Sequence, residues 1–127
     1  MLFRSQEGAK IILGGQTVDG KYVTPTIFDE APAGASINRE EIFGPVLSVL
    51  TVGSNEEAIR LANDSEYGLS GSVWSEDIAH AEAVAHQLQA GSVLINDSIM
   101  QFGVPLLPFG GVKKSGSGRT QIGRAHV

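Results

Sequence analysis

The feature that most constrains the fold is an alternation of three apolar runs with two helical patterns between residues 45 and 96. The runs read PVLSVLTV, GLSGSVW and SVLIN, at residues 45–52, 68–74 and 92–96. The first has few polar breaks, which is typical of a strand covered on both faces. Strands that alternate with helices usually pair in parallel through right-handed crossovers. The sequence therefore predicts an α/β fold, a parallel sheet with helices on both faces.

The two segments between the runs carry the signals of helix ends. Ser54 is followed three residues later by Glu57, a capping-box pattern that predicts the start of the first helix. Ser75 is predicted to cap the second helix, and Gly91 suits its C-terminal end. Each segment also has an apolar stripe at helical spacing. The stripes are Ala58, Ile59, Leu61 and Ala62 in the first helix, and Ile78, Ala81, Val84, Ala85 and Leu88 in the second.

The segments on either side of this alternation are less regular. The run AKIIL, at residues 9–13, ends at two glycines, and KYVTPTIF, at residues 21–28, is typical of a strand. Pro25 inside the second run favours an edge or irregular strand, because proline cannot donate to a sheet ladder. From residue 97 to residue 117 the chain is rich in glycine and proline. A loop of that length inside a compact domain is usually functional or disordered.

Charge and composition exclude several classes of protein. The net charge is −5 and no basic patch is present, which disfavours nucleic acid and anionic membranes as partners. No apolar run is long enough to span a bilayer, and the first residues lack a signal-peptide core, so we expect a cytoplasmic protein. The chain has no cysteine, which excludes a disulfide scaffold and a thiol nucleophile within it. His80 and His86 do not share a helical face, so no metal site is expected.

The stretch EEIFGPV, at residues 40–46, places two carboxylates and an aromatic ring directly before a predicted strand. From composition alone, Glu40 and Glu41 are a solvated acidic pair, and Phe43 is a core aromatic residue. Downstream, GGVKKSGSGR has the glycine and lysine of an anion-binding turn, but it lacks the spacing of a phosphate-binding loop. Lys113 and Lys114 are therefore predicted to lie in a solvated turn.

Four motifs together resemble a known family. They are EEIFGPV, NDSEYGLSGSVWS, AGSVLIND and LPFGGVKKSGSGR, and they occur in that order and spacing between residues 40 and 119. The likeness covers roughly residues 8–119 and is to the C-terminal part of the catalytic domain of NAD(P)-dependent aldehyde dehydrogenases. It implies oxidation of an aldehyde to a carboxylic acid with NAD+ or NADP+ in a homo-oligomeric enzyme. The loop INDSIMQFGVPLLPFGG resembles the branch that handles longer aliphatic or aromatic aldehydes.

The resemblance also assigns site residues. It implies that Glu41 hydrogen-bonds the nicotinamide ribose and that Phe43 packs on the side of the nicotinamide. A carboxylate accepts well from two hydroxyls, and an aromatic face holds a flat ring in place. The resemblance implies that Phe102 and Phe109 line the substrate tunnel, and a plain core position is an equal alternative for both. Phe109 matches the PFGG motif directly, and Phe102 is placed approximately because the loop varies in length.

The departures from the family pattern bear on activity. In the family, four parts of the enzyme lie upstream of the matched region: the nucleophilic Cys, the general-base Glu, the oxyanion-binding Asn and the dinucleotide-binding fold. The Cys forms a thiohemiacetal with the aldehyde. None has a match here, and the helix and strand that follow SGxGR in the family are also missing. Residues 1–121 are thus expected to form an incomplete half of the catalytic domain, inactive alone. Residues 122–127, IGRAHV, are expected to be a non-native tail.

Two other functions remain open from the sequence. One is a truncated, non-catalytic paralogue that acts as a binding or oligomer-pairing module. The other is an unrelated α/β nucleotide-binding domain, which the absence of a G-x-G-x-x-G motif disfavours.

Overall fold

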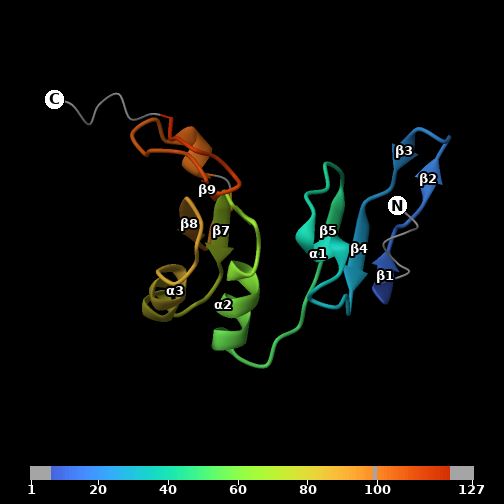
Figure 1. Cartoon of the computed structure of the whole chain (residues 1–127), viewed down its shortest axis with the longest axis horizontal. Helices are drawn as coiled ribbons and strands as arrows, with labels where there is room; N and C mark the ends of the chain where they lie inside the picture. Colours follow the sequence, from blue (N-terminus) through green and yellow to red (C-terminus); the bar gives the residue numbers. More distant parts are fainter. Residues whose placement is uncertain (1–6, 99, 121–127) are drawn as a thin grey trace. The chain divides into compact units, whose positions relative to one another are not determined.

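Two units make up the chain in the computed structural model (Figure 1), which describes residues 7–98 and 100–120. Unit 1 comprises Met1–Gly53 and unit 2 comprises Ser54–Val127. The predicted tail, residues 122–127, lies outside the described residues. No helix in the described ranges is long and apolar enough to cross a membrane.

Unit 1 is built on a three-stranded sheet in the order β1-β4-β5. β1 pairs antiparallel with β4, and β4 pairs parallel with β5. Of the edge or irregular strand expected around Pro25, the irregular form is confirmed, because the run is interrupted between β3 and β4; the edge position is wrong, because β4 is the central strand. Pro25 lies in the gap before β4, where its missing N–H removes no ladder bond. The elements of unit 1 are β1 (Lys10–Leu13), β2 (Thr17–Val18), β3 (Tyr22–Val23), β4 (Thr26–Asp29), α1 (Ser36–Arg39) and β5 (Val46–Ser48).

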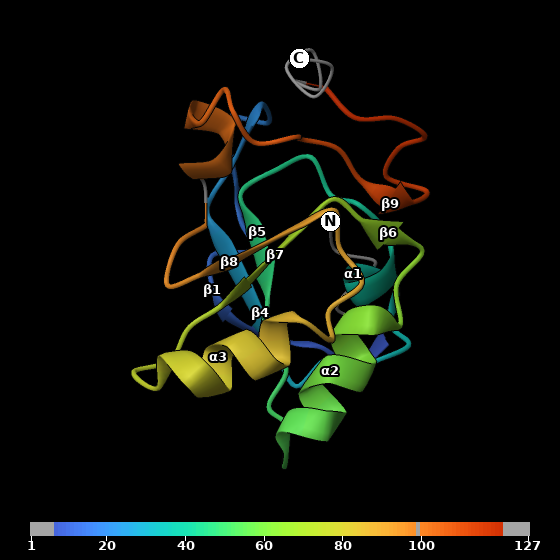
Figure 2. The ribbon, with the colours of Figure 1, turned by 90° about the vertical axis from the view of Figure 1, so that its left-hand side faces the viewer.

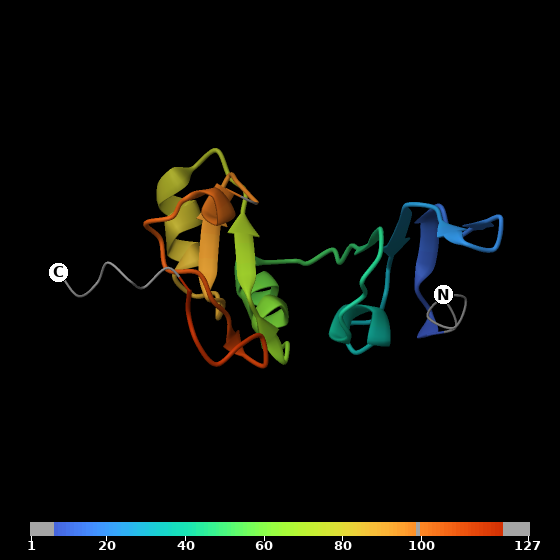
Figure 3. The ribbon, with the colours of Figure 1, turned by 90° about the horizontal axis from the view of Figure 1, so that it is seen from above.

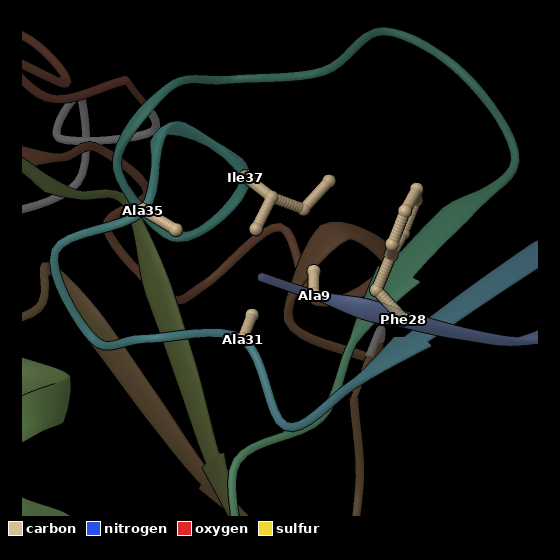
Figure 4. Packing of buried hydrophobic residues seen from close by; sticks show 5 residues of the cluster. All are labelled: Ala9, Phe28, Ala31, Ala35 and Ile37. Atoms are coloured by element: carbon tan, nitrogen blue, oxygen red, sulfur yellow. The ribbon is translucent and has the colours of Figure 1, made fainter. Parts of the chain in front are cut away.

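The hydrophobic core of unit 1 lies between β4, α1 and the segments next to them (Figure 4). Phe28 is the largest side chain in it and is 1% exposed. Figure 4 shows the side chains gathered around the same space. Ile42 and Val46 pack against this cluster, which links it to the start of β5. The cluster consists of Ala9, Phe28, Ala31, Ala35 and Ile37.

The third strand of this sheet, β5, is shorter and more exposed than its sequence indicates. It covers Val46–Ser48 rather than residues 45–52, and Leu47 is 56% exposed. Only β4 borders it in the described part of the chain. A strand at a sheet edge cannot be covered on both faces without further strands or helices, which accounts for the difference.

Unit 2 contains a parallel pair of strands, β7 and β8, in register from Ser70 and Ser92. The helix α3 packs against both strands, and α2 lies beside the same pair (Figures 2 and 3). A second small sheet pairs β6 with β9 antiparallel. The elements are α2 (Asn55–Asn63), β6 (Tyr67–Gly68), β7 (Ser70–Val73), α3 (Ile78–Ala85), β8 (Ser92–Ile95), the 3-10 helix η2 (Met100–Gly103) and β9 (Val112–Lys113).

The two helices of unit 2 begin with polar caps. Ser54 accepts a hydrogen bond from the Glu57 amide at 3.2 Å, as the capping-box pattern predicts. The expected cap of the second helix at Ser75 is wrong by two residues. Asp77 caps α3, and its side chain accepts from the His80 amide at 3.0 Å. The Ser75 hydroxyl accepts from the Asp77 amide, in the turn that precedes the helix. Both residues suit a cap, and the later one begins the helix.

The fold class is confirmed as mixed α/β, but a single parallel sheet with helices on both faces is not observed. β7 and β8 are parallel neighbours, as expected, whereas β5 belongs to the sheet of unit 1. In unit 2, α2 and α3 line one hollow together with β7.

Asn63 joins the end of α2 to the end of the second helical segment. Its amide donates to the Gln87 carbonyl at 2.8 Å, and its side-chain oxygen accepts from the Gln89 N–H at 2.7 Å. We expect Asn63→Ala to lower the free energy of unfolding by about 1–3 kcal/mol, because two backbone groups lose their partner.

Urea unfolding followed by the fluorescence of Trp74, the only tryptophan, measures this change. The matched control is Asn55→Ala on the same helix as Asn63, which removes a side-chain contact with His80 of α3. Equal midpoints for the two variants would contradict the linking role of Asn63.

Candidate functional site

The segment before β5 presents two predicted site residues to solvent. Glu41 is exposed, Phe43 is 93% exposed, and Ile42 between them packs against the core of unit 1. Burying a bare aromatic ring is ordinarily favourable, so a nearly fully exposed Phe indicates a surface built to meet another group. Phe43 is not the core aromatic residue that composition alone suggests; Phe28 fills that place.

Backbone hydrogen bonds fix how this segment turns. The Gly44 amide donates to the Ile42 carbonyl at 2.9 Å, and the Val46 amide donates to the Gly44 carbonyl at 2.8 Å. These are two successive three-residue turns, which are common where a strand begins. The Thr26 amide of β4 then donates to the Pro45 carbonyl at 2.9 Å, which fastens the segment to the sheet.

The short helix α1 supports the same segment from the other side. The Glu7 carboxylate accepts from the Ser36 amide at 2.6 Å and from the Ser36 hydroxyl at 2.9 Å, so a distant acid caps α1. Asn38 on α1 accepts from the Ser48 hydroxyl at 2.6 Å. The helix is therefore tied both to the start of the described chain and to β5, which holds residues 40–45 between two fixed ends.

A hollow of about 510 Å³ opens beside Phe43. Its walls combine this segment, the core residues Phe28 and Ile37, and the β2–β3 hairpin. The hairpin brings Lys21 and Tyr22 to the hollow, two residues that the sequence motifs did not indicate. The signal that locates them is the Asp19-Gly20 turn, where both residues have positive φ, as a tight hairpin favours.

The segment before β5 exposes an acceptor, the Glu41 carboxylate, and an aromatic ring, Phe43; the ring lines the hollow, and Glu41 is not among the lining residues. In the described part of the chain, no hydrogen bond or ion pair engages the Glu41 carboxylate. An added Cβ on Gly44 meets only Ile42 Cγ2, at 3.9 Å, so the chain itself leaves the space in front of Gly44 open. An ionised carboxylate accepts from a pair of hydroxyls, and an exposed ring packs against a flat one. This arrangement fits a ribose joined to a planar base.

The other two predicted residues lie in unit 2. Phe109 is half-buried, and its backbone exchanges hydrogen bonds with Thr120 at 3.2 and 2.7 Å. Phe102 is in η2, and its side chain lies outside the described part. A hollow of about 420 Å³ lies beside this loop, with apolar walls from β8, Met100, Val104 and Leu107. Phe109 is not among its lining residues.

The two lysines of the glycine-rich segment differ in their surroundings. The Lys113 ammonium donates to the carbonyls of Asn63 and Ser65 at 2.7 and 3.1 Å, at the end of α2, where cations are favoured. Lys114 pairs with Glu66 at 2.7 Å, and this hydrogen bond raises the pKa of Lys114. Lys114 thus matches the predicted solvated turn, whereas Lys113 fastens that turn to α2.

Comparison with known proteins gives one family. The model of the "Aldehyde dehydrogenase family" matches residues 4–126. Geranial dehydrogenase of Castellaniella defragrans is 45% identical over 115 residues, which cover 89% of this chain and 23% of that protein. Betaine aldehyde dehydrogenase of Bacillus subtilis is 47% identical over 120 residues, which cover 90% of this chain and 24% of that protein.

Solved structures agree with these relatives. An indole-3-acetaldehyde dehydrogenase complexed with NAD+ superposes with a TM-score of 0.84 at 45% identity, over 91% of this chain and 24% of that one. A Mycobacterium tuberculosis aldehyde dehydrogenase complexed with NAD+ also gives 0.84, at 39% identity and the same coverage. The chain spans about a quarter of the length of the relatives that it matches.

Proposed function

Because this chain belongs to the aldehyde dehydrogenase family, we propose that it is the C-terminal part of a catalytic domain that oxidises an aldehyde to a carboxylic acid with NAD+ or NADP+. Its curated relatives carry names of aldehyde-oxidising enzymes, and its structural neighbours are complexes with NAD+. The observation that carries the proposal is the pair of exposed side chains in the segment before β5, Glu41 and Phe43, of which Phe43 lines a hollow in unit 1.

The residues of this chain hold and orient the cofactor. The Glu41 carboxylate accepts hydrogen bonds from the ribose hydroxyls next to the nicotinamide, and such charge-assisted bonds are stronger than neutral ones. The ring of Phe43 packs against the nicotinamide and restricts its rotation. Ile42, anchored in the core, sets the spacing between them. When bound, NAD(P)+ supplies the hydride acceptor.

The aldehyde is proposed to approach along the glycine- and proline-rich loop of unit 2. Phe102 and Phe109 are proposed to line this path, and the hollow at β8 offers further apolar surface. Such walls suit an aldehyde with a long aliphatic or aromatic tail, because burial of apolar surface is favourable.

This chain alone is proposed to be inactive, because it has no cysteine to act as the nucleophile. The purified chain is expected to form no NADH from any aldehyde. The nucleophile, the general base and the dinucleotide-binding fold are supplied by polypeptide outside these residues, and assembly of the whole enzyme into homo-oligomers stays a prediction.

A chimera tests the cofactor assignment. The matched segment of the Bacillus subtilis betaine aldehyde dehydrogenase is replaced by that of this chain, and NADH formation from betaine aldehyde is measured. Glu41→Gln is expected to lower the kcat/KM of the chimera for NAD+ by about 10- to 100-fold, through a higher KM for NAD+ or a lower kcat. The reason is the loss of about 1.5–3 kcal/mol of charged hydrogen bonding.

Glu40→Gln is the matched control, since it removes the same charge one residue away; it is expected to stay within twofold of the parent chimera. An inactive chimera that is nonetheless folded contradicts the proposed function. Equal losses for the two variants contradict the role of Glu41 while leaving the family activity in place.

A further inference from the structure

Thr26, the first residue of β4, carries a hydroxyl that is closed off from solvent. In the described part of the chain it is the one buried polar residue, at 1% exposed. Its hydroxyl donates to the Thr24 carbonyl at 2.8 Å and accepts from the Gly15 amide at 2.9 Å. A buried hydroxyl is costly unless it is hydrogen-bonded, and this one both donates and accepts. The side chain therefore joins two backbone segments in addition to filling space.

The two partners of this hydroxyl form the base of the β2–β3 hairpin. Gly15 lies before β2, and Thr24 lies directly after β3. The Thr24 amide donates to the Gln16 carbonyl at 3.0 Å, and the Thr24 hydroxyl accepts from the Gln16 amide at 3.2 Å. Because β2 and β3 have only two residues each, the hairpin has little stability of its own. The Thr26 hydroxyl thus fixes the base from which the hairpin extends.

The close fit at this base depends on two glycines. Gly14 and Gly15 both have positive φ, at 72° and 82°. A Cβ on Gly14 would overlap the Pro25 carbonyl oxygen and meet the Thr26 Oγ1 at 2.9 Å. Glycine adopts such φ values without strain and allows a close approach of the backbone. The two glycines therefore let the Gly15 amide reach the Thr26 hydroxyl.

The backbone of Thr26 connects the hairpin base to the segment before β5. Its amide donates to the Pro45 carbonyl at 2.9 Å, and Thr26 pairs in register with Val46 of β5. Tyr22 of the hairpin lines the same hollow as Phe43 and Pro45. Thr26 is not among the lining residues of that hollow. It lies behind the hollow, hydrogen-bonded to both of the segments that form these walls.

We propose that Thr26 is a positioning residue for the cofactor: its hydroxyl fixes the hairpin base and the start of β4, and its amide thereby holds the segment that presents Glu41 and Phe43. The inference rests on the proposed function. Without the hydroxyl, the Gly15 amide and the Thr24 carbonyl lose their partner. The start of β4 then opens to let water reach them, which releases the Pro45 carbonyl. The ring of Phe43 orients the nicotinamide less well, and small misplacements of reacting groups lower rates steeply.

Two variants of the chimera with the Bacillus subtilis betaine aldehyde dehydrogenase separate the hydroxyl from the rest of the side chain. Thr26→Val keeps the branched shape and removes the hydroxyl, whereas Thr26→Ser keeps the hydroxyl and removes the methyl group. Thr26→Val is expected to lower kcat/KM for NAD+ by about tenfold and to change the KM for betaine aldehyde by less than about twofold. Thr26→Ser is expected to keep kcat/KM for NAD+ within about threefold of the parent chimera.

Ala31→Gly is the control for a general loss of stability. Ala31 belongs to the core cluster of unit 1, does not line the hollow and does not bond the Thr26 hydroxyl. Its replacement removes a buried methyl group and makes the unfolded chain more flexible, so unit 1 is expected to become less stable. The kcat/KM for NAD+ is nevertheless expected to stay within about twofold of the parent chimera.

Hydrogen exchange in the full chain locates the effect of the hydroxyl. Thr26→Val is expected to speed exchange at the Gly15 amide by about tenfold or more, whereas Thr26→Ser is expected to leave it close to the rate of the unmodified chain. The Val49 amide, which donates to the Phe28 carbonyl at 2.9 Å, reports on the pairing of β4 with β5 farther along the strands. It is expected to stay protected in both variants.

The outcomes distinguish the role of Thr26 from the proposed function. A folded parent chimera without activity contradicts the proposed function. In an active chimera, the role of Thr26 is overturned by an unchanged kcat/KM for NAD+ in Thr26→Val, by equal losses in the valine and serine variants, or by an equal loss in Ala31→Gly. Unchanged exchange at the Gly15 amide of Thr26→Val also overturns it, and this measurement needs no chimera.

Discussion

Phe28→Ala is expected to lower the free energy of unfolding of unit 1 by about 3–5 kcal/mol. Phe28 is 1% exposed and is the largest side chain of the cluster around β4 and α1. Its truncation removes the transfer free energy of a whole ring and leaves a cavity that the neighbouring alanines cannot fill. A loss of this size is a large fraction of the stability of a small domain, so the amides of β4 are expected to exchange as in an unfolded chain.

Phe43→Ala is the matched control, because it removes the same ring from a position that is 93% exposed. Its effect on unfolding is expected to stay within about 0.5 kcal/mol. In the chimera, Phe43→Ala is expected to weaken NAD+ binding although it leaves the stability of the protein unchanged. Hydrogen exchange of β4 and the KM for NAD+ measure the two effects, and a destabilised Phe43→Ala chain would place that ring in the core instead.

Gly91→Ala is expected to disrupt unit 2, with a loss of about 3 kcal/mol or more. A Cβ at Gly91 overlaps the Gly110 carbonyl oxygen and meets the Gly111 Cα at 3.0 Å. Both groups belong to the backbone, so the clash is relieved only if the glycine-rich segment moves away from β8, the strand that follows Gly91. Trp74 fluorescence during urea unfolding reports the change.

Gly103→Ala provides the comparison, since a Cβ there meets nothing within 4 Å. It is expected to leave the urea midpoint unchanged or raise it slightly, because alanine restricts the unfolded chain. Similar midpoints for Gly91→Ala and Gly103→Ala would mean that the segment at residues 110–111 is not packed as described.

Local signals in the sequence were sufficient for several elements. The cap at Ser54 depends on Glu57 only three residues away, and the strand at Ser92–Ile95 is set by its own apolar run. The cap of α3 was misplaced because Ser75 and Asp77 are both good caps, and only the packed helix distinguishes them.

Features that depend on distant residues were less accessible. The length of β5 was overestimated because its apolar run fits a fully covered strand, whereas the described chain supplies only β4 as a neighbour. Tyr22 and Lys21 were missed at the candidate site because a hairpin brings them to Phe43 from elsewhere in the sequence. Composition alone does not distinguish Phe28 from Phe43, although the resemblance singles out Phe43; their burial does so.

The paired hydrogen bonds of Asn63 have a consequence for the chemical ageing of the molecule. Asparagine side chains slowly lose ammonia, and the product here is a carboxylate. The group that donates to the Gln87 carbonyl then becomes an anion facing that carbonyl, while the acceptor toward the Gln89 N–H persists. In a stored sample, each molecule with this change at Asn63 has a repulsive contact in place of its hydrogen bond to the Gln87 carbonyl. The mass spectrum of the sample records the fraction of such molecules.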